Sequence, residues 1–391
     1  MASPRGLKAI PRAVWALGFV SLFMDASSEL IHSLLPVFMV SALGASITSV
    51  GAVEGIAEAT ALITRIFSGT LSDYFGRRKL LTALGYALAA CSKPLFPLAH
   101  TVGMVLLARF ADRVGKGIRG APRDALIGEI APPGMRGACF GLRQAMDTVG
   151  AFIGPLLAML LMAMLAENMR QVLWLAVIPA VISVIILVFG VREPEKPPGA
   201  AARSPLRLRD IPAVGGAFWR LAALGALLTL ARSSEAFLVL RGQSIGLTPA
   251  AVPVVMVVMN VVYAAAAYPA GVVSDRLGRR GLLLFGAGFL MAAELTLGVA
   301  GGMPLLMLGV CLWGLHLGFT QGVLAAMVAD ITPARLRGTA YGVFNFVCGV
   351  AILVSSVTAG ALWDGFGPRA AFLAGAMAAG VAGLSLWRML R

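Results

Sequence analysis

The sequence predicts an all-α membrane protein in which twelve transmembrane helices form two pseudo-symmetric bundles of six, and three observations lead to this fold class. Of the 391 residues, 59% are hydrophobic and 13% are charged, whereas about a quarter of the residues of a soluble domain are charged. Twelve apolar stretches between Val14 and Trp387 are each long enough to cross about 30 Å of hydrocarbon as a helix. In addition, a charged motif between two of these stretches returns in the second half of the chain.

The repeat relates the two halves of the chain to one another. The motif GTLSDYFGRR at 69–78, between the second and third apolar stretches, returns as GVVSDRLGRR at 271–280. Two further segments repeat at nearly the same offset: 129–137 matches 330–338, and 27–29 matches 233–235. Three matches at a nearly constant offset indicate two parallel repeats, an architecture that is typical of transporters.

The segment 192–216 interrupts the apolar pattern in the middle of the chain. It begins with REPEKPP and continues with further arginines. Prolines and charges of this kind are typical of a linker and not of a membrane helix. We therefore expect an N-terminal six-helix bundle at residues 1–191, a cytoplasmic linker at 192–216 and a C-terminal six-helix bundle at 217–391.

The formal net charge of +14 is spread unevenly along the chain. Basic residues gather in alternate connections, and the connections between them, such as 41–49, are short and almost uncharged. This positive-inside pattern predicts a multi-pass protein of the inner (plasma) membrane with both termini in the cytoplasm. The charge then indicates anionic lipids at the cytoplasmic face as partners and not nucleic acid. The residues concerned include Arg77, Arg78, Lys79, Arg119, Arg123, Arg136, Arg192, Lys196, Arg203, Arg207, Arg209, Arg276, Arg279, Arg280, Arg335 and Arg337.

The cysteines and the known catalytic motifs give no sign of an enzyme. Cys91, Cys139, Cys311 and Cys348 lie in or near apolar stretches without CxxC spacing, so we expect neither a disulfide nor a metal site. The sequence has no nucleophile elbow and no phosphate-binding loop. The first apolar stretch is too long for a signal peptide and is expected to stay as the first membrane helix. We expect no enzymatic activity and no cofactor.

The motif at 69–78 resembles the signature of the major facilitator superfamily. The resemblance covers the whole chain, because the second copy, the central linker and the twelve apolar stretches also fit. Arg113 and Gly117 are similar to the fourth-helix motif of the family, with Lys116 at a position where the family often has glutamine. The resemblance implies a transporter that works by alternating access.

A second resemblance concerns the fifth apolar stretch. Gly150, Gly154 and Pro155 are similar to the fifth-helix motif of the drug–proton antiporters, although the further glycines of that motif are replaced by the apolar run 156–161. The match implies a role in proton-coupled export. Ordinary close packing of helices explains the same glycines equally well.

The resemblance also implies a gate at the cytoplasmic side. It places Asp73 near Gly338 at the start of the eleventh helix, and the repeat then places Asp275 near Gly137 at the start of the fifth. A helix N-terminus offers free amide donors and partial positive charge to such a carboxylate. The arginines of the motif are also explained as topology signals. The expected gate residues are Gly69, Asp73, Gly76, Arg77, Arg78, Gly271, Asp275, Gly278, Arg279 and Arg280.

Ionisable side chains inside the apolar stretches are the main candidates for function, because a charge in lipid costs several kcal/mol. Spacings of three and four residues place several of them on shared helix faces. They can couple protons or bind substrate, or they can form permanent ion pairs that hold the N-terminal half together. The candidates are Asp25, Glu29, His32, Glu54, Glu58, Arg109, Asp112, Arg113, Lys116, Arg143, Asp147, Arg232 and Glu235.

The second half of the chain is poorer in such charges. Asn260 aligns with Glu58 through the repeat, and His316 lies in the middle of the tenth stretch. This asymmetry predicts that the first half handles ions and that the second half completes the substrate cavity, with His316 as a proton or substrate contact or simply hydrogen-bonded to a neighbour. Lys93 and Glu294 also align with each other, and for both we expect helix packing or snorkelling.

Together these observations predict a secondary active transporter for a small-molecule substrate, working as a monomer with protons as the coupling ion. The fifth-helix motif and the carboxylates of the first two stretches favour proton-coupled efflux by antiport. The alternative is proton-coupled uptake of a small polar or anionic organic solute, favoured by the many arginines and lysines inside the apolar stretches.

Overall fold

The structure is a computed structural model, and it describes residues 9–75, 77–132, 134–192, 215–277, 279–333 and 336–390. These residues are helical almost throughout, and no strand occurs among them. Their helices make twelve crossings in two bundles of six, so the predicted fold class is confirmed. The linker predicted at 192–216 lies almost wholly outside the described residues, and the predicted domain boundaries stay predictions.

The first bundle contains six crossings built from seven α-helices. They are α1 (Arg12–Leu43), α2 (Ile47–Phe75), α3 (Arg78–Ser92, continued by the short helix η2, Lys93–Leu95), α4 (Val102–Ile130), α5 (Arg136–Met164), and α6 (Met169–Leu175) with α7 (Val177–Gly190). Pro179 stands in the first turn of α7, where a missing N–H leaves no helical hydrogen bond broken.

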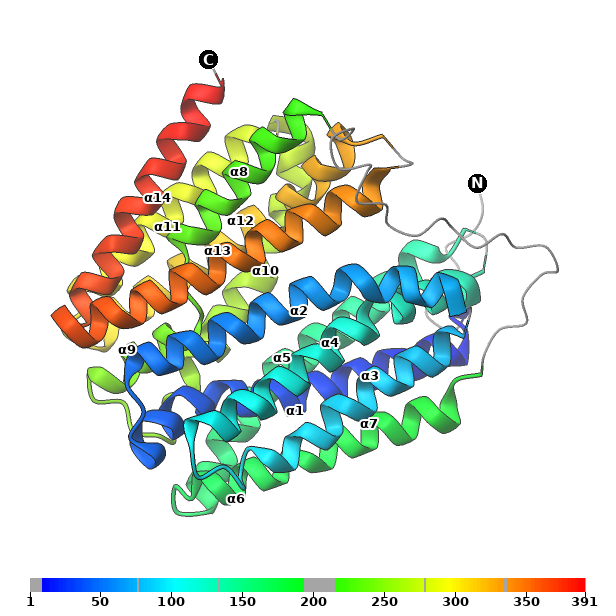
Figure 1. Cartoon of the computed structure of the whole chain (residues 1–391), viewed down its shortest axis with the longest axis horizontal. Coiled ribbons are helices and arrows are strands. Elements are labelled where there is room, and N and C mark those ends of the chain that lie inside the picture. Colours follow the sequence, from blue (N-terminus) through cyan, green and yellow to red (C-terminus); the bar gives the residue numbers. More distant parts are fainter. Residues whose placement is uncertain are drawn as a thin grey trace.

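The second bundle repeats this arrangement. Its crossings are α8 (Gly216–Ala231) with α9 (Ala236–Ser244), α10 (Val254–Leu277), α11 (Arg279–Val299), α12 (Met303–Ile331), α13 (Arg337–Phe366) and α14 (Pro368–Leu390). Figure 1 shows the two bundles lying against each other, with α2 and α13 side by side between them.

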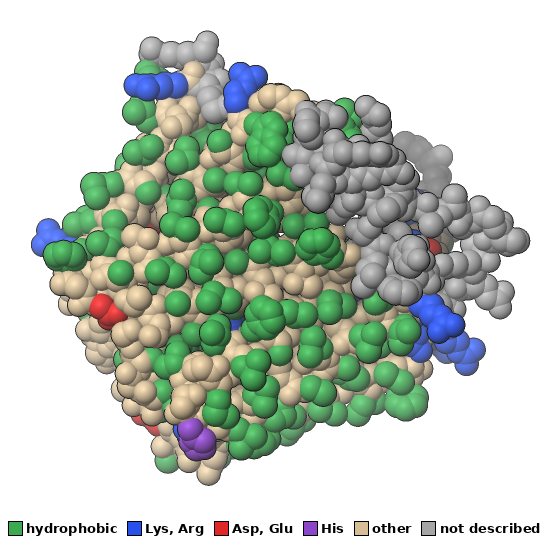
Figure 2. Space-filling model, in the orientation of Figure 1, with side chains coloured by type: hydrophobic (Ala, Val, Ile, Leu, Met, Phe, Trp, Pro, Cys, Tyr) green, Lys and Arg blue, Asp and Glu red, His purple; other side chains and the backbone are tan. Residues whose placement is uncertain are grey.

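The outer surface has the character expected of a protein surrounded by lipid. Nine spans among the described helices are long and apolar enough to cross a membrane by length and composition alone. Large apolar side chains are exposed, with Phe189 at 83% and Phe366 at 78%. Figure 2 shows hydrophobic side chains over the visible face and charged ones mostly near its margins. The protein is therefore a multi-pass membrane protein.

α4 is longer and more polar than the sequence suggested. Arg119 and Arg123, which we expected in the connection after the fourth apolar stretch, lie inside α4 and are buried. A helix of 29 residues is about 43 Å long at 1.5 Å per residue. It therefore extends past the hydrocarbon, and it carries its basic residues into the protein instead of into an exposed loop.

The two bundles meet at one end of the molecule, where α1 ends and α2 begins; we call this the closed end. Asp364 of α13 accepts hydrogen bonds from the backbone N–H groups of Ile47 and Thr48 at 3.0 and 2.8 Å and from the Thr48 hydroxyl at 2.6 Å. A residue of one bundle thus caps the first turn of α2 in the other. Nearby, Gln243 donates to Ser41 at 2.8 Å, again between bundles.

Glycines let α2 and α13 touch along the closed end. A Cβ added at Gly51 would lie 2.2 Å from the carbonyl oxygen of Ser356, and one at Gly360 would lie 2.6 Å from Thr48 Cα. Small residues of this kind allow backbones to approach in a membrane protein, where packing replaces the hydrophobic effect between helices. In Figure 1 the same two helices diverge toward their other ends, which we call the motif end because the repeated motif lies there.

A side chain at Gly51 should open the closed end. We expect Gly51→Ala to weaken contact between the bundles, because its Cβ meets backbone that cannot rotate away; overpacking of this kind costs ~1–3 kcal/mol. Disulfide formation between Ser41→Cys and Gln243→Cys, in a protein without the native cysteines, measures the contact. The yield should fall in Gly51→Ala. Gly288→Ala, in open space on α11, is the control, and equal yields in both would contradict the assignment of the seam.

Candidate functional site

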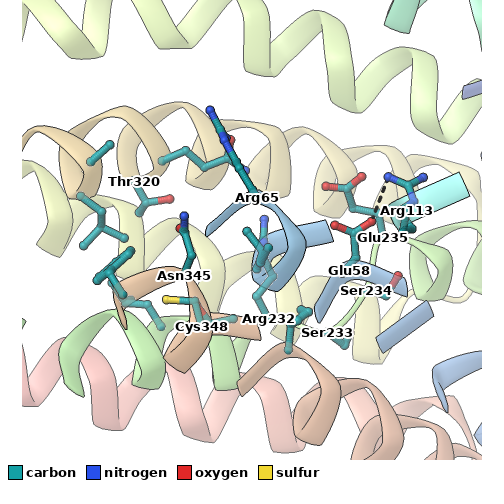
Figure 3. A pocket seen from close by; sticks show the side chains of 18 of the residues that line it. Glu58, Arg65, Arg113, Arg232, Ser233, Ser234, Glu235, Thr320, Asn345 and Cys348 are labelled. Carbon is teal, nitrogen blue, oxygen red and sulfur yellow. Dashed lines mark ion pairs between the residues drawn. The ribbon is translucent and has the colours of Figure 1, made fainter. Parts of the chain in front are cut away.

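A cavity of about 470 Å³ lies between the two bundles. Its walls come from α1, α2, α4, the α8–α9 junction, α12 and α13 (Figure 3). It includes Arg65 of α2 and Tyr341 of α13, both on the motif-end side of the molecule. Since the bundles are in contact at the closed end, the cavity extends toward the motif end. The ionisable residues in its wall are Glu29, His32, Glu58, Arg65, Arg113, Lys116, Arg232, Glu235, His316, Tyr341 and Cys348.

One ion pair forms the wall on the side of the first bundle. Arg113 Nη1 lies 3.4 Å from Glu58 Oε1, and the Glu58 side chain is 37% exposed while that of Arg113 is 2% exposed. Two of the Arg113 nitrogens, Nε and Nη2, are buried without a hydrogen-bond partner among the described residues. Lys116 follows one turn later, is exposed to the cavity, and makes no ion pair within the described parts of the chain. Lys116 therefore leaves a positive charge available at this wall.

Behind this wall lies a buried ion pair between α2 and α4. Arg109 binds Glu54 through two parallel hydrogen bonds, Nε to Oε1 at 3.2 Å and Nη2 to Oε2 at 2.7 Å. Both side chains are about 1% exposed or less. His32 lies between this pair and Glu29, 3.6 Å from Glu54 and 3.4 Å from Glu29. Of these four predicted site residues, Glu29 and His32 reach the cavity, and Glu54 and Arg109 do not.

A second buried pair joins α4 to η2 and α1. Lys93 Nζ lies 2.8 Å from Asp112 Oδ1 and donates to the Ser28 hydroxyl at 2.9 Å. Asp112 also lies 3.9 Å from Arg109 and 3.5 Å from Arg113. We expected helix packing or snorkelling for Lys93; the side chain is 1% exposed, so it is packed inside the bundle and does not snorkel. Its ammonium group pairs with a carboxylate inside the bundle. This contact compensates the positive charge, so the side chain does not have to extend to the distant surface.

Asp25 and Asp147 belong to a third cluster, nearer the motif end and outside the cavity wall. Arg119 lies 3.5 Å from Asp25, and Asp147 lies 3.1 Å from Arg143, one turn away on α5 as predicted. The carboxyl groups of Asp25 and Asp147 also face each other between α1 and α5. The surrounding partners, which the sequence did not assign to a site, are Arg123, Asp124, Ser21 and Tyr86.

The second bundle contributes a break in its first crossing. Residues 232–235 are not helical, so the seventh crossing consists of two helices and not the single span that we expected. The break is stabilised by Ser234, whose N–H donates to the Ser356 hydroxyl at 3.1 Å and whose own hydroxyl accepts from Ala236 N–H at 3.3 Å. Serine side chains compete in this way with helical hydrogen bonds. The repeat-related serines 27 and 28 remain inside α1.

Arg232 and Glu235 flank this break and line the cavity (Figure 3). Within the described ranges neither side chain makes an ion pair or a hydrogen bond, although each is half-buried. They differ in this from the charged groups of the first bundle, most of which are paired. Unwound backbone and unpaired charge at the membrane midplane are the features from which transporters build substrate sites.

The remaining candidates of the second bundle separate into two kinds. His316 lines the cavity, and its Nδ1 lies 2.9 Å from the carbonyl oxygen of Gly286, so it is hydrogen-bonded to a neighbour, and its role as a proton or substrate contact stays a prediction. Asn260 does not line the cavity; its amide donates to the Ala151 carbonyl at 3.4 Å and joins α10 to α5. Sequence reasoning overlooked the polar wall residues Thr229, Thr320, Gln321, Tyr341 and Asn345, because uncharged side chains in a membrane helix carry no clear signal.

The motif residues make their described contacts within each bundle. Arg78 pairs with Glu129 at 2.5 Å, and Arg279 pairs with Asp330 in the second half. Glu129 and Asp330 are themselves repeat-related, whereas Arg279 is the counterpart of Arg77 and not of Arg78, so the two halves pair neighbouring arginines of the motif with the same acidic position. Arg77 is exposed. The gate expected at Asp73 and Asp275 involves side chains outside the described residues, as do Gly69, Gly76, Gly271, Gly278 and Arg280, and it stays a prediction.

The glycines of the fifth crossing serve close packing against α1. A Cβ at Gly150 would lie 2.4 Å from the carbonyl oxygen of Leu22, and one at Gly154 would lie 2.7 Å from that of Ala26. Pro155 lies inside α5, next to this contact. The four cysteines are free.

Comparison with known proteins identifies the family. The model of the Major Facilitator Superfamily matches residues 17–240 and 221–391. The chain belongs to this superfamily. It is 31% identical to an MFS-type transporter of Methanocaldococcus jannaschii over 97% of this chain and 95% of that one. It is also 22% identical to the multidrug resistance protein MdtH of Salmonella arizonae, over 85% of this chain and 82% of the relative.

A solved structure supports the same fold. A variant of the nucleoside transporter NupG superposes with a TM-score of 0.82 at 14% identity, covering 97% of this chain and 100% of that one. This superfamily member is therefore a membrane transporter, and its cavity between the bundles is the candidate path for a solute.

The Glu54–Arg109 pair should be structural. We expect Glu54→Gln to lower the free energy of unfolding by ~3–5 kcal/mol, because it removes the carboxylate that accepts two hydrogen bonds from the buried Arg109 and leaves only Asp112, at 3.9 Å, to compensate its charge. Replacing both residues by glutamine should recover part of the loss. Thermal unfolding of the purified protein in detergent measures both effects. The control is Glu58→Gln, whose side chain is 37% exposed and should cost much less; equal costs for the two single variants would show that the pair has no special role.

Proposed function

We propose that this transporter moves a small polar solute with an anionic group by alternating access, in exchange for protons. The observation that carries the proposal is the cavity between the bundles, closed at one end and lined by charged groups without partners. Its volume of about 470 Å³ suits a small organic molecule. The seam of α2 and α13 at the closed end has to separate for the solute to leave on that side.

The chemistry of the wall favours an anionic group on the solute. Arg232 and Lys116 come from opposite bundles and make no ion pair in the described part of the chain. An anionic group bound between them would join the two bundles and satisfy both cations. Glu235 offers an acceptor for a donor group elsewhere on the same solute. Drug-like hydrophobic cations fit this wall less well.

Proton coupling is assigned to Asp25 and Asp147. Two facing carboxyl groups repel when both are ionised, and one proton held between them removes the repulsion. They connect α1 with α5, beside Arg119 and Arg143. Because α1 also carries Glu29 and His32 in the cavity wall, a change at this pair can be transmitted to the solute site through a single helix.

Efflux is the direction we propose, on the support of the MdtH relatives and the fifth-helix glycines. In this proposal the motif end faces the cytoplasm of the inner membrane, where anionic lipids meet its basic residues, and the solute enters the cavity from that side. The protein acts as a monomer. Uptake of an anionic solute is the second candidate, since Arg232 and Lys116 would serve it equally. Everted vesicles distinguish the two by whether an imposed proton gradient drives the solute in or out.

Loss of either unpaired cation should weaken binding of the solute. We expect Arg232→Gln and Lys116→Gln each to reduce affinity about tenfold or more, since a hydrogen bond to a charged group contributes ~1.5–3 kcal/mol. Ligand-induced thermal stabilisation across a panel of anionic and uncharged solutes measures the loss. Arg369→Gln, exposed on α14, is the control. Binding that is equal in all the variants would contradict the anion site.

The proposed proton site gives a separate prediction. Asp25→Asn should abolish accumulation driven by a proton gradient, because the pair can no longer take up and release a proton. The same variant should retain exchange of labelled for unlabelled solute in proteoliposomes without a gradient, which serves as an internal control for folding and binding. Gradient-driven accumulation at the wild-type rate would rule out this pair as the coupling site.

A further inference from the structure

One buried carboxylate is left unexplained by the central cavity. Glu294 lies in α11 and is 1% exposed. Its Oε1 is buried without a hydrogen-bond partner, and no ion pair reaches the side chain within the described residues. An ionised carboxylate in lipid or apolar protein costs several kcal/mol unless a positive charge compensates it. The packing role that we expected for Glu294 does not supply that charge.

Glu294 belongs to a second cavity, of about 230 Å³, between α8, α11, α13 and α14. Among the described residues that line this cavity, Glu294 is the only one with a charged side chain. The polar groups beside it are the hydroxyls of Ser233, Ser355 and Thr358, and Ser355 donates to the carbonyl oxygen of Leu230 at 2.9 Å. The cavity therefore offers several oxygen atoms and no cation of its own.

The carboxyl group occupies a place kept free by small residues. A Cβ added at Gly375 of α14 would lie 2.6 Å from Glu294 Cδ and 2.7 Å from its Oε2. Three alanines of α14, at 371, 374 and 378, line the same cavity. This helix thus leaves room for the carboxyl group but provides no donor to it.

The residue of the first bundle that aligns with Glu294 is a buried charge with partners inside the bundle. This counterpart is Lys93, which pairs with Asp112 at 2.8 Å and donates a hydrogen bond to Ser28. The counterpart of Asp112 falls in the region of Trp313, whose Nε1 is also buried without a partner among the described residues. Within the described residues, the internal ion pair of the first bundle has no equivalent in the second, and no side chain there compensates the charge of Glu294.

We propose that Glu294 is the binding group of a second cation site, which takes a monovalent cation, a proton or Na⁺, in the C-terminal bundle. A single carboxylate is neutralised by one positive charge, and oxygen atoms of hydroxyl and carbonyl groups suit a hard cation. No group of three or more acidic, histidine or cysteine residues that could hold a multivalent metal occurs in the described parts of the chain.

The site is placed to communicate with the solute cavity. Ser233, in the α8–α9 break, lines both cavities, and Leu230 and Ala231 at the end of α8 line the second. A cation bound at Glu294 would therefore contact the segment that positions Arg232 on the other side. Cation binding at Glu294 is independent of the identity of the solute and of the direction of transport.

Cation-dependent stability of the purified full-length protein tests the site without any solute. Thermal unfolding is measured in NaCl and in choline chloride at equal concentration, over a series of pH values. The variants are Glu294→Gln and, as a matched control, Glu167→Gln, an exposed carboxyl at the α5–α6 turn. Binding of a cation to the folded state alone raises the apparent Tm.

A rise in Tm with Na⁺ over choline in the wild type and Glu167→Gln, lost in Glu294→Gln, would identify sodium. An equal Tm in both salts, with a pH dependence that only Glu294→Gln lacks, would identify the proton. Identical profiles for all three proteins would overturn the proposal.

A second measurement uses the wild-type protein and does not depend on folding of a variant. A hydrophobic carbodiimide reacts with protonated carboxyl groups in apolar surroundings, and peptide mass spectrometry locates the product. Labelling of Glu294 that rises as the pH falls supports the site, and protection by Na⁺ over choline assigns it to sodium. Absence of labelling at every pH, with Na⁺ absent, would contradict it.

Discussion

The cost of placing charge inside a membrane governs the arrangement of this protein. In the first bundle almost every buried charge is paired with an opposite charge. Arg109 binds Glu54 through two hydrogen bonds, and Lys93 pairs with Asp112. Such pairs are weak evidence for stability, since burial costs about as much as the attraction returns. They do fix the position of α4 against α1 and α2, and so hold Arg113 and Lys116 in the cavity wall.

Because most buried charges are paired, the few charges without partners are the candidates for binding a ligand. Arg232 and Glu235 flank a break in the seventh crossing, and Lys116 faces them from the other bundle across the same cavity. Glu294 lies on the far side of the break in a cavity of its own. The positions that the repeat shares thus form the helical scaffold and include the paired arginines of the motif. The positions at which the two halves differ hold the charged groups that remain free for ligands.

Much of the fold followed from the sequence, because membrane helices are specified by length and apolar composition and the repeat fixes the two halves. The placement of Glu54 and Glu58 on one face of α2 followed from helical spacing. The partners of the buried charges did not follow from the sequence. No sequence pattern indicates that Lys93 contacts Asp112, or that Asp25 faces Asp147, because those contacts depend on how the helices cross. The sequence also did not predict the break at 232–235. The repeat-related serines 27 and 28 stay helical, so the serines alone do not distinguish the two cases. Contacts such as that of Ser234 with Ser356 decide the difference.

The central claim is that the charged cavity is a water-filled path open at the motif end and closed at the other. Cysteine accessibility at Asn345, in the cavity wall on α13, tests this most directly. Asn345→Cys, in a protein without native cysteines, would be treated with a membrane-impermeant thiol reagent applied from either side of the membrane. The account predicts rapid labelling from the side of the motif end and slow labelling from the other. Labelling from neither side, or faster labelling from the closed end, would contradict it.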